Sequence, residues 1–336
     1  MSVPLSLLDL AFVAKGQAPR ETFAGCVAMA QLAEKLDYRR IWYAEHHNIT
    51  SIASSATSVL IAHVAAHTKT IRLGAGGIML PNHAPLLIAE QFGTLASLHP
   101  DRIDLGLGRA PGTDPVTSRA LRVLPQTSDA FPEDILELQG YLGDESRIPG
   151  IEAIPGKGTH VPLYILGSSL FGAQLAARLG LPYAFASHFA PDALERAVAI
   201  YRREFQASEQ LAKPYVIAGV NVIAADRADD AHDQLAAVQR WRVRALLGRG
   251  VGGESWTETE AQSVLDSPAG QRIKTMGTYA AVGTASEVAA YLEAFAKKAD
   301  ADELMTVHPS PTIDERLRSL TLLAENRDPS HGIQRS

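Results

Sequence analysis

The chain has 336 residues, of which 46% are hydrophobic and 20% are charged. This length and balance allow a large buried core and are typical of a globular protein. A formal net charge of -6, without a block of lysine or arginine, argues against a nucleic-acid partner and against binding to a membrane surface.

Cys26 is the single cysteine, so no intramolecular disulfide can form. The chain begins without a signal-peptide pattern and has no apolar run long enough to span a bilayer, so we expect a cytoplasmic protein.

Short apolar runs alternate with amphipathic helical segments along the chain. The expected strands are residues 5–12, 41–44, 71–75, 103–107, 163–166, 183–186, 215–224 and 303–307. The expected helices are residues 20–36, 53–67, 85–98, 131–142, 170–179, 193–205, a long helix ending at Leu247, 286–297 and 313–324. Strands that alternate with helices imply a parallel sheet. Eight such units predict a single α/β domain over residues 1–336, a closed (β/α)8 TIM barrel.

Two segments depart from this alternation. Residues 248–279 are rich in Gly, Ser, Thr and Glu, and we expect an irregular insertion after the seventh strand. A long irregular segment inside a compact domain is usually functional or disordered, so this one is a candidate lid. Residues 327–336 are polar and are expected to fray.

In a barrel of this kind the reacting groups lie at the C-terminal ends of the strands. The second strand ends in Glu45-His46-His47-Asn48. Successive side chains on a strand point to opposite faces, so only one of the two histidines can face the barrel mouth. A histidine there is a candidate general acid or base, and a pair of structural histidines is the alternative. Adjacent histidines chelate poorly and no ligand partner stands at metal spacing, so no metal site is predicted.

Glycines mark the ends of the third and fourth strands. Ala75, Gly76 and Gly77 allow either an ordinary turn or the close approach of backbone to a ligand. The glycines of 105–112 do not have the spacing of a dinucleotide loop, and Pro111 interrupts where the helix would begin.

Several residues near the ends of the fourth and fifth strands are candidates for holding an anion. Arg109 and Arg119 can each donate a planar pair of hydrogen bonds to phosphate, or can form surface salt bridges instead. Gly167, Ser168 and Ser169 run directly into a helix, whose N-terminus either is capped by the serines or attracts a phosphate.

Three further histidines are weaker candidates for lining a substrate pocket. His188 and His308 close the sixth and eighth strands, and His47 lies beside His46.

Taken together, these segments resemble the bacterial-luciferase-like flavin-dependent monooxygenase family, over nearly the whole chain from Leu7 to Leu323. Within that family the chain is most similar to single-chain bacterial proteins whose substrates are largely unassigned. The motifs that carry the resemblance are Trp42-Tyr43-Ala44-Glu45-His46-His47, Gly76-Gly77-Ile78-Met79-Leu80-Pro81-Asn82-His83, Arg102-Ile103-Asp104-Leu105-Gly106-Leu107-Gly108-Arg109, Leu166-Gly167-Ser168-Ser169 and Leu179-Gly180-Leu181-Pro182.

The resemblance implies a (β/α)8 barrel that binds FMN at its C-terminal mouth. His46 matches the family's catalytic histidine, and the Gly76–Gly77 bond falls where members carry a non-proline cis peptide. Arg109, Arg119 and Ser168 match positions that hold the flavin phosphate. Gly108 stands where luciferases carry a cysteine beside the flavin, which argues against light emission. The Phe171–Gly172 stretch replaces a hydroxyl residue of the phosphate loop.

The activity implied is that of a monooxygenase. Reduced FMN would react with O2 to give a C4a-(hydro)peroxide that attacks a small organic substrate, while His46 moves a proton. No NAD(P)H fingerprint is present, so a separate flavin reductase is expected to supply reduced FMN. The resemblance also implies a homodimer. The alternatives are hydride transfer with the deazaflavin F420 and a non-catalytic flavin-binding protein.

Overall fold

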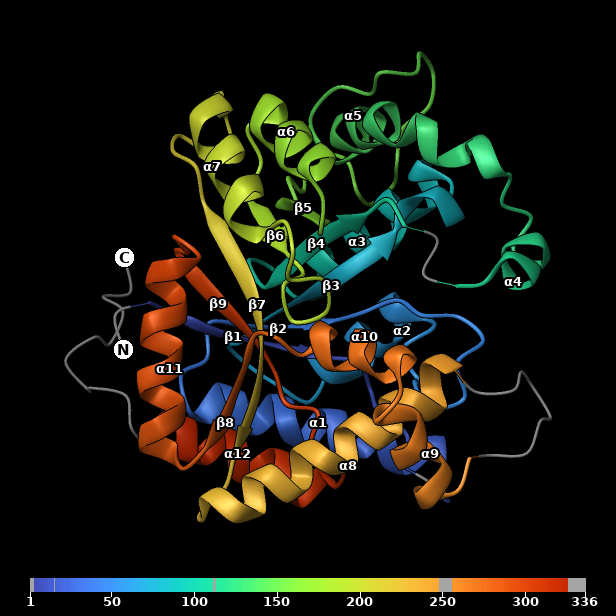
Figure 1. Cartoon of the computed structure of the whole chain (residues 1–336). Helices are drawn as coiled ribbons and strands as arrows, with labels where there is room; N and C mark the ends of the chain where they lie inside the picture. Colours follow the sequence, from blue (N-terminus) through green and yellow to red (C-terminus); the bar gives the residue numbers. More distant parts are fainter. Residues whose placement is uncertain (1–2, 15, 111–112, 248–255, 326–336) are drawn as a thin grey trace.

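A closed barrel of parallel strands forms the centre of the computed structural model (Figure 1). The structure describes residues 3–14, 16–110, 113–247 and 256–325. Neighbouring strands follow the order β1, β2, β3, β4, β5, β6, β7 and β9, and β9 pairs with β1 to close the ring. Their bounds are β1 (Leu5–Asp9), β2 (Arg40–Tyr43), β3 (Arg72–Met79), β4 (Ile103–Gly108), β5 (Leu163–Gly167), β6 (Tyr183–Phe185), β7 (Val216–Ala224) and β9 (Glu303–Val307). The predicted (β/α)8 barrel is therefore confirmed.

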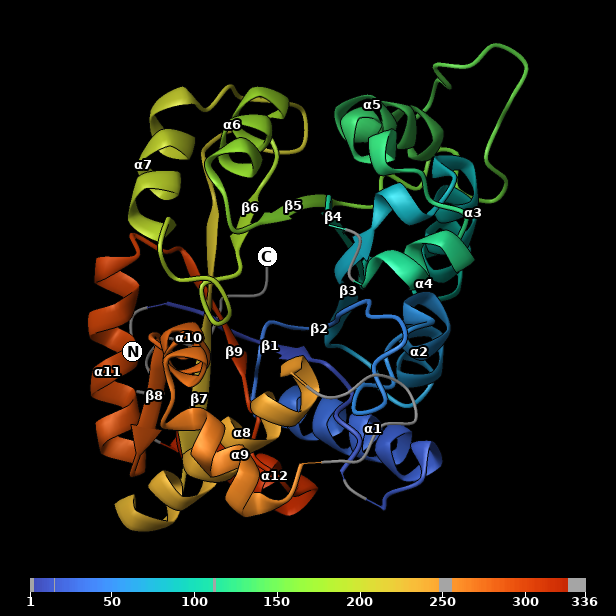
Figure 2. The ribbon, with the colours of Figure 1, turned by 45° about the vertical axis from the view of Figure 1, so that its right-hand side comes forward.

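Helices surround the barrel and follow the strands in the expected order (Figure 2). They are α1 (Pro19–Lys35), α2 (Thr57–Ala65), α3 (Pro85–Leu98), α5 (Phe131–Leu142), α6 (Leu170–Leu179), α7 (Leu194–Glu204), α8 (Ala228–Leu247), α11 (Ala285–Lys298) and α12 (Ile313–Glu325). Shorter elements are α4 (Pro115–Ala120) and the 3-10 helices Leu80–Asn82 and Pro125–Ala130. The main core lies between this layer and the outer face of the strands, where side chains such as Phe92 and Tyr201 are fully buried.

The segment expected to be irregular contains two helices, α9 (Glu258–Leu265) and α10 (Pro268–Met276). Thr257 caps α9 in a reciprocal box with Glu260, and Ser267 caps α10. Polar caps and short apolar runs thus form two helices in a segment whose overall composition had predicted irregular structure. Residues 248–255 lie outside the described part of the chain.

An additional strand, β8 (Ala280–Gly283), was not predicted. It pairs with residues 221–224 of β7, which is long enough to extend beyond its pairing with β6. The eighth strand of the barrel is therefore β9, and β8 lies outside the ring.

The barrel interior holds a second, smaller apolar cluster. Its buried members are Leu8, Trp42, Ala44, Tyr164, Ala184, Ile217, Met305 and Val307. On β2 the inward set is therefore Trp42 and Ala44, while Ile41 and Tyr43 face the helices. Since side chains alternate along a strand, this fixes which later residues lean toward the barrel axis.

A buried ion network closes the N-terminal end of the barrel. Arg40 Nη1 lies 2.7 Å from Asp104 Oδ2, and Arg40 Nε lies 3.0 Å from Glu303 Oε1. Arg72 also pairs with Asp104 at 2.5 Å. Burial alone would raise the pKa of Asp104, but Arg40 and Arg72 outweigh it and lower that pKa. Four strands, β2, β3, β4 and β9, are thus tied together around two fully buried carboxylates.

We predict that Arg40→Met lowers the free energy of unfolding by about 3–5 kcal/mol, because removing one member of a buried pair leaves carboxylates uncompensated. Urea unfolding at neutral pH measures this change. The matched control is Arg318→Met, which removes an exposed pair with Asp226 and should leave the midpoint unchanged. Equal effects of the two substitutions would show that the buried network contributes no more than a surface pair.

Candidate functional site

The predicted site residues gather at the C-terminal end of the barrel, opposite the ion network. His46, Arg109, Ser168 and His188 each follow the end of a different barrel strand, and Gly76 lies in the C-terminal half of β3. Parallel strands in a closed barrel bring these ends to one rim.

His46 continues the inward set of β2. It follows Trp42 and Ala44 by even steps, and both of these lie in the interior cluster. His46 is half-buried and lies close enough to His188 to lower the pKa of that ring. The question that the sequence left open between His46 and His47 is therefore answered in favour of His46 as the histidine nearer the barrel axis.

His188 lies over the mouth on the sixth strand's end. Burial lowers its pKa to about 4, with smaller contributions from Arg242 and His46. Its Nδ1 is buried and finds no hydrogen-bond partner among the described residues. A Cβ on Gly219 would fall 2.3 Å from this atom, so the ring packs directly on the glycine. His188 is thus a neutral imidazole at pH 7 with an unused hydrogen-bonding atom.

A short hydrogen-bond chain holds the His188 segment. Asn221 Nδ2 donates to the His188 carbonyl at 2.7 Å, and Arg242 Nη2 donates to Asn221 Oδ1 at 3.0 Å. Arg242 comes from α8, which returns from the far end of β7. The sequence reasoning missed Asn221 and Arg242, because their partners are set by the path of α8 and not by any local pattern.

Glu45 is the most densely bonded carboxylate at this end of the barrel. Its oxygens accept from His47 Nε2 at 2.8 Å, His83 Nε2 at 2.9 Å and the Met79 N–H at 3.0 Å. Burial alone would raise the pKa of Glu45, but His83, His47 and the Met79 N–H together lower it. Glu45 therefore holds the chain after β2 against the chain after β3, directly beside His46.

The two weaker candidates differ in their surroundings. His47 lies after the end of β2, and its Nε2 is 2.8 Å from Glu45 Oε1. His308 is buried on the outer face of β9, between Ser319 Oγ of α12 at 2.9 Å and Thr306 Oγ1 at 3.2 Å. Burial lowers the pKa of His308 to about 3. The prediction of a pocket-lining role is wrong for His308, because Met305 and Val307 fill the inward positions of β9 and His308 has the opposite parity. The same role for His47 stays a prediction.

The glycines of β3 leave no space for side chains. The Gly76–Gly77 peptide bond is cis, as the resemblance implied. A Cβ on Gly76 would lie 2.9 Å from Trp42 Cβ, and one on Gly77 would lie 2.7 Å from the Gly106 carbonyl oxygen. Ala75 is fully buried with its side chain in the outer core, so only its backbone could approach a cofactor.

The anion candidates meet where β4 and α6 approach each other. The Arg109 guanidinium lies over the Phe171 ring, 4.2 Å from its centroid, in the first turn of α6. Ser168 and Ser169 are exposed, and Ser169 makes no side-chain hydrogen bond to cap the helix. Arg109 therefore lies beside the first turn of α6, which the two exposed serines precede. Arg119 is exposed on α4, a separate short helix after β4.

Two searches of the described residues bear on other kinds of site. No group of three or more His, Cys, Asp or Glu side chains in that part of the chain could hold a metal ion. No helix there combines the length and apolarity needed to cross a membrane.

Comparison with known proteins places this geometry in a family. A model of the luciferase-like monooxygenase family matches residues 4–302. A luciferase-like monooxygenase of Escherichia coli K12 is 47% identical over 306 residues, 90% of this chain and 91% of the relative. The N-acetyl-S-alkylcysteine monooxygenase of Bacillus subtilis 168 is 37% identical over 189 residues, 55% of this chain and 57% of that protein. The crystal structure of apo-MsnO8 superposes with a TM-score of 0.84 at 34% identity, over 96% of this chain and 98% of that one.

We predict that Glu45→Gln lowers the free energy of unfolding at pH 7 by about 1.5–3 kcal/mol, the usual value of a hydrogen bond to a charged group. A carboxylate whose folded pKa is lowered adds stability above its unfolded pKa of about 4.3, and that stability is lost as pH falls through the folded value. The difference between the two proteins should therefore be largest near neutrality and narrow below about pH 4.

Urea unfolding across this pH range is the measurement. The control Glu293→Gln alters an exposed carboxylate on α11 and should leave stability unchanged throughout. A difference that persists unaltered into acid would mean that the Glu45 charge is not what stabilises the segment.

Proposed function

This chain belongs to the luciferase-like monooxygenase family, and we propose that it is an FMN-dependent monooxygenase that uses reduced FMN and O2 on a small organic substrate. The observation that carries the proposal is the position of Arg109 over Phe171, at the open N-terminus of α6 and on the same rim as His46. That arrangement fits a phosphate at one end of a flavin and a proton-transferring group at the other.

The phosphate end would be held by charge and by backbone. Arg109 is exposed and can donate two parallel hydrogen bonds to phosphate oxygens, while the Phe171 ring restricts its position. The N-terminus of α6 adds free N–H groups and the positive end of the helix dipole. Ser168 and Ser169 add hydroxyl donors, and Gly167 lets the backbone approach closely. Phe171 thus compensates for the missing hydroxyl residue by orienting the arginine.

The ring end would rest on the glycine backbone of β3. No side chain projects from Gly76 or Gly77, and Trp42 and Leu8 lie directly below. A planar ring system can therefore lie close to the backbone of residues 75–77. The His46 and His188 rings would then lie beside the reacting region, at the strand ends that carry them.

When bound, reduced FMN supplies the electrons that activate O2, and the protein supplies position and proton transfer. His188 has a pKa of about 4, so it stays neutral at pH 7 and can offer a hydrogen bond without serving as an acid. His46 is then the residue proposed to move a proton. Glu45 fixes the chain that carries His46, through His83 and the Met79 N–H.

We also propose that residues 248–279 cover the site. The described part of this segment is anchored to α8 by a buried cluster of Val243, Ala261, Leu265 and Ile273, and by Arg240 and Arg244 on Glu258. A cover at this place would exclude water from the reaction. The remaining parts of the proposal are a separate flavin reductase, a homodimer and a cytoplasmic location.

Two alternatives keep the fold and change the function. An F420-dependent enzyme would transfer hydride without consuming O2, and a flavin carrier would bind FMN and turn nothing over. Oxygen uptake with reduced FMN and substrate separates all three. The first substrate to supply is an N-acetyl-S-alkylcysteine, the class named for the Bacillus relative, followed by aldehydes, sulfonates and ketones. Failure to bind reduced FMN would turn the assignment toward F420.

We predict that His46→Ala retains FMN binding and lowers kcat by about 10²- to 10⁴-fold, the usual contribution of a general acid or base. Stopped-flow turnover with saturating reduced FMN measures it, and the pH dependence of kcat should flatten in the variant. His63→Ala is the control, because His63 lies in the last turn of α2 with its ring against His67, and it should leave kcat unchanged. Full activity of His46→Ala would remove this residue from the mechanism.

We predict that Arg109→Met weakens FMN binding by about 10- to 100-fold, as loss of a hydrogen bond to a charged group would. Riboflavin lacks the phosphate, so its affinity should hardly change, and the ratio of the two affinities is the measurement. Arg119→Met in the same titration tests the second predicted arginine. An equal loss for FMN and riboflavin would mean that Arg109 supports the pocket without contacting the phosphate.

A further inference from the structure

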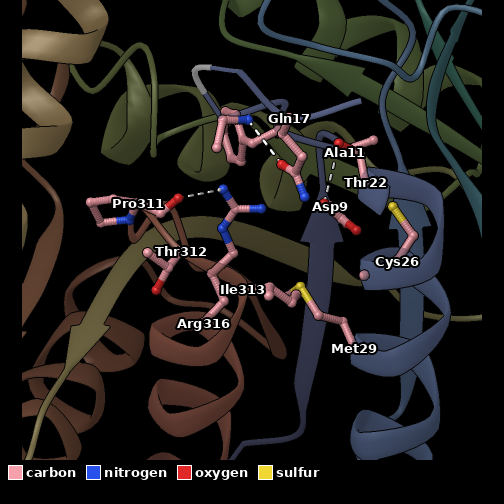
Figure 3. A pocket seen from close by; sticks show the side chains of 13 residues that line it. Asp9, Ala11, Gln17, Thr22, Cys26, Met29, Pro311, Thr312, Ile313 and Arg316 are labelled. Atoms are coloured by element: carbon pink, nitrogen blue, oxygen red, sulfur yellow. Dashed lines mark hydrogen bonds between the residues drawn. The ribbon is translucent and has the colours of Figure 1, made fainter. Parts of the chain in front are cut away.

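A second cavity lies outside the barrel, between β1, α1 and α12 (Figure 3). Its volume is about 180 Å³, and its polar lining residues include Asp9, Gln17, Thr22 and Arg316. None of its lining residues belongs to the flavin site proposed above. Cavities of about 150 Å³ hold a benzene-sized molecule, so this one has room for a small metabolite.

The cavity is lined by polar groups that the fold buries without a partner. Asp9 is 4% exposed and Thr22 is 5% exposed. Asp9 Oδ1 accepts from the Ala11 N–H at 2.8 Å, but Asp9 Oδ2 and Thr22 Oγ1 find no hydrogen-bond partner among the described residues. Leaving such groups unsatisfied destabilises the fold, and a ligand or an ordered water would recover that free energy.

Opposite charges face this cavity without pairing. Arg316 is 8% exposed, donates to the carbonyls of Ser310 and Pro311, and lies 5.2 Å over the Phe12 ring. Neither Arg316 nor Asp9 forms a salt bridge in the described part of the chain, although the Asp9 charge acts on Arg316 and partly offsets the lowering of its pKa by burial. Figure 3 shows Asp9 and Thr22 on one side of the pocket and Arg316 on the other, with Gln17 between them.

The neighbouring groups define what each side can bind. Gln17 Oε1 accepts from the Ala14 N–H at 3.1 Å, which leaves its amide N–H₂ as a donor. The Cys26 thiol is protonated, because burial and then the Asp9 charge raise its pKa. One side therefore offers acceptors to a cation, and the other offers donors to an anion. Met29 and Ile313 add an apolar wall between them.

We propose that this cavity is a binding site for a small zwitterion of the α-amino-acid type. Its ammonium group binds Asp9 and Thr22, its carboxylate binds Arg316 and Gln17, and a short apolar side chain packs on Met29 and Ile313. Such a ligand neutralises both buried charges at once, which neither a simple cation nor a simple anion can do.

The test uses the full chain saturated with FMN and three probes of nearly equal shape. L-Valine carries both charges, isobutylamine only the ammonium and isovalerate only the carboxylate. Calorimetric titration should show L-valine binding at least about tenfold more tightly than either analogue, since each lost charged hydrogen bond weakens binding by that order. L-Valine should also raise Tm. No saturable binding of L-valine, or equal binding of all three probes, overturns the proposal and indicates a cavity that holds water.

Two threonine variants separate ligand binding from folding. Thr22→Val removes a hydroxyl without a partner, so Tm without ligand should hold or rise while L-valine affinity falls about tenfold. Thr68→Val is the matched control, because Thr68 is also buried but its Oγ1 donates to the Val64 carbonyl at 3.1 Å. That variant should lower Tm and leave L-valine binding unchanged. An unchanged L-valine affinity in Thr22→Val would contradict the assigned contact, and Asp9→Asn provides a second check on the ammonium side.

Discussion

The structure depends on the buried pairing of Arg40 with Asp104 and Glu303 at the N-terminal end of the barrel. Charges in a low-dielectric interior must meet, so β2, β4 and β9 are held at the heights that bring these three side chains together. Because side chains alternate along each strand, this arrangement also determines which residues point toward the barrel axis at the C-terminal end. From Arg40, even steps along β2 lead through Trp42 and Ala44 to His46. The network thus sets the position of a residue on which the proposed chemistry relies.

The two ends of the barrel differ in how fully their polar groups are satisfied. At the closed end, Asp104 and Glu303 each accept from several donors, including Tyr215 on Glu303 at 2.7 Å. At the open end, the buried Nδ1 of His188 finds no partner in the described chain, and the serines before α6 are exposed. Satisfied groups make a rigid base, whereas unsatisfied groups are available to a ligand. This contrast supports the proposal that a cofactor binds at the mouth.

The sequence predicted the barrel well because its strands are short apolar runs separated by amphipathic helices. It failed where the structure depends on which face of a strand a side chain lies on, or on contacts between residues far apart in the sequence. The strand β2 is buried on both sides, so its pattern could not show whether His46 or His47 turns inward. Glu45 meets His83 across 38 positions, and His308 meets Ser319 on a helix that the pattern places only approximately. The short strand β8 consists of Ala, Val and Gly, so its composition carries little strand signal.

On the proposed function, His46 and His188 play different parts in proton transfer at the mouth. His188 is buried, and Arg242 adds a positive charge nearby, so both effects oppose a second cation on that ring. A proton delivered to the site therefore belongs on His46, and His188 remains a neutral neighbour. Glu45 does not accept that proton, because His83, His47 and the Met79 N–H keep its pKa low and hold it as a carboxylate. The fold thus keeps Glu45 as a carboxylate and His188 as a neutral ring on either side of His46.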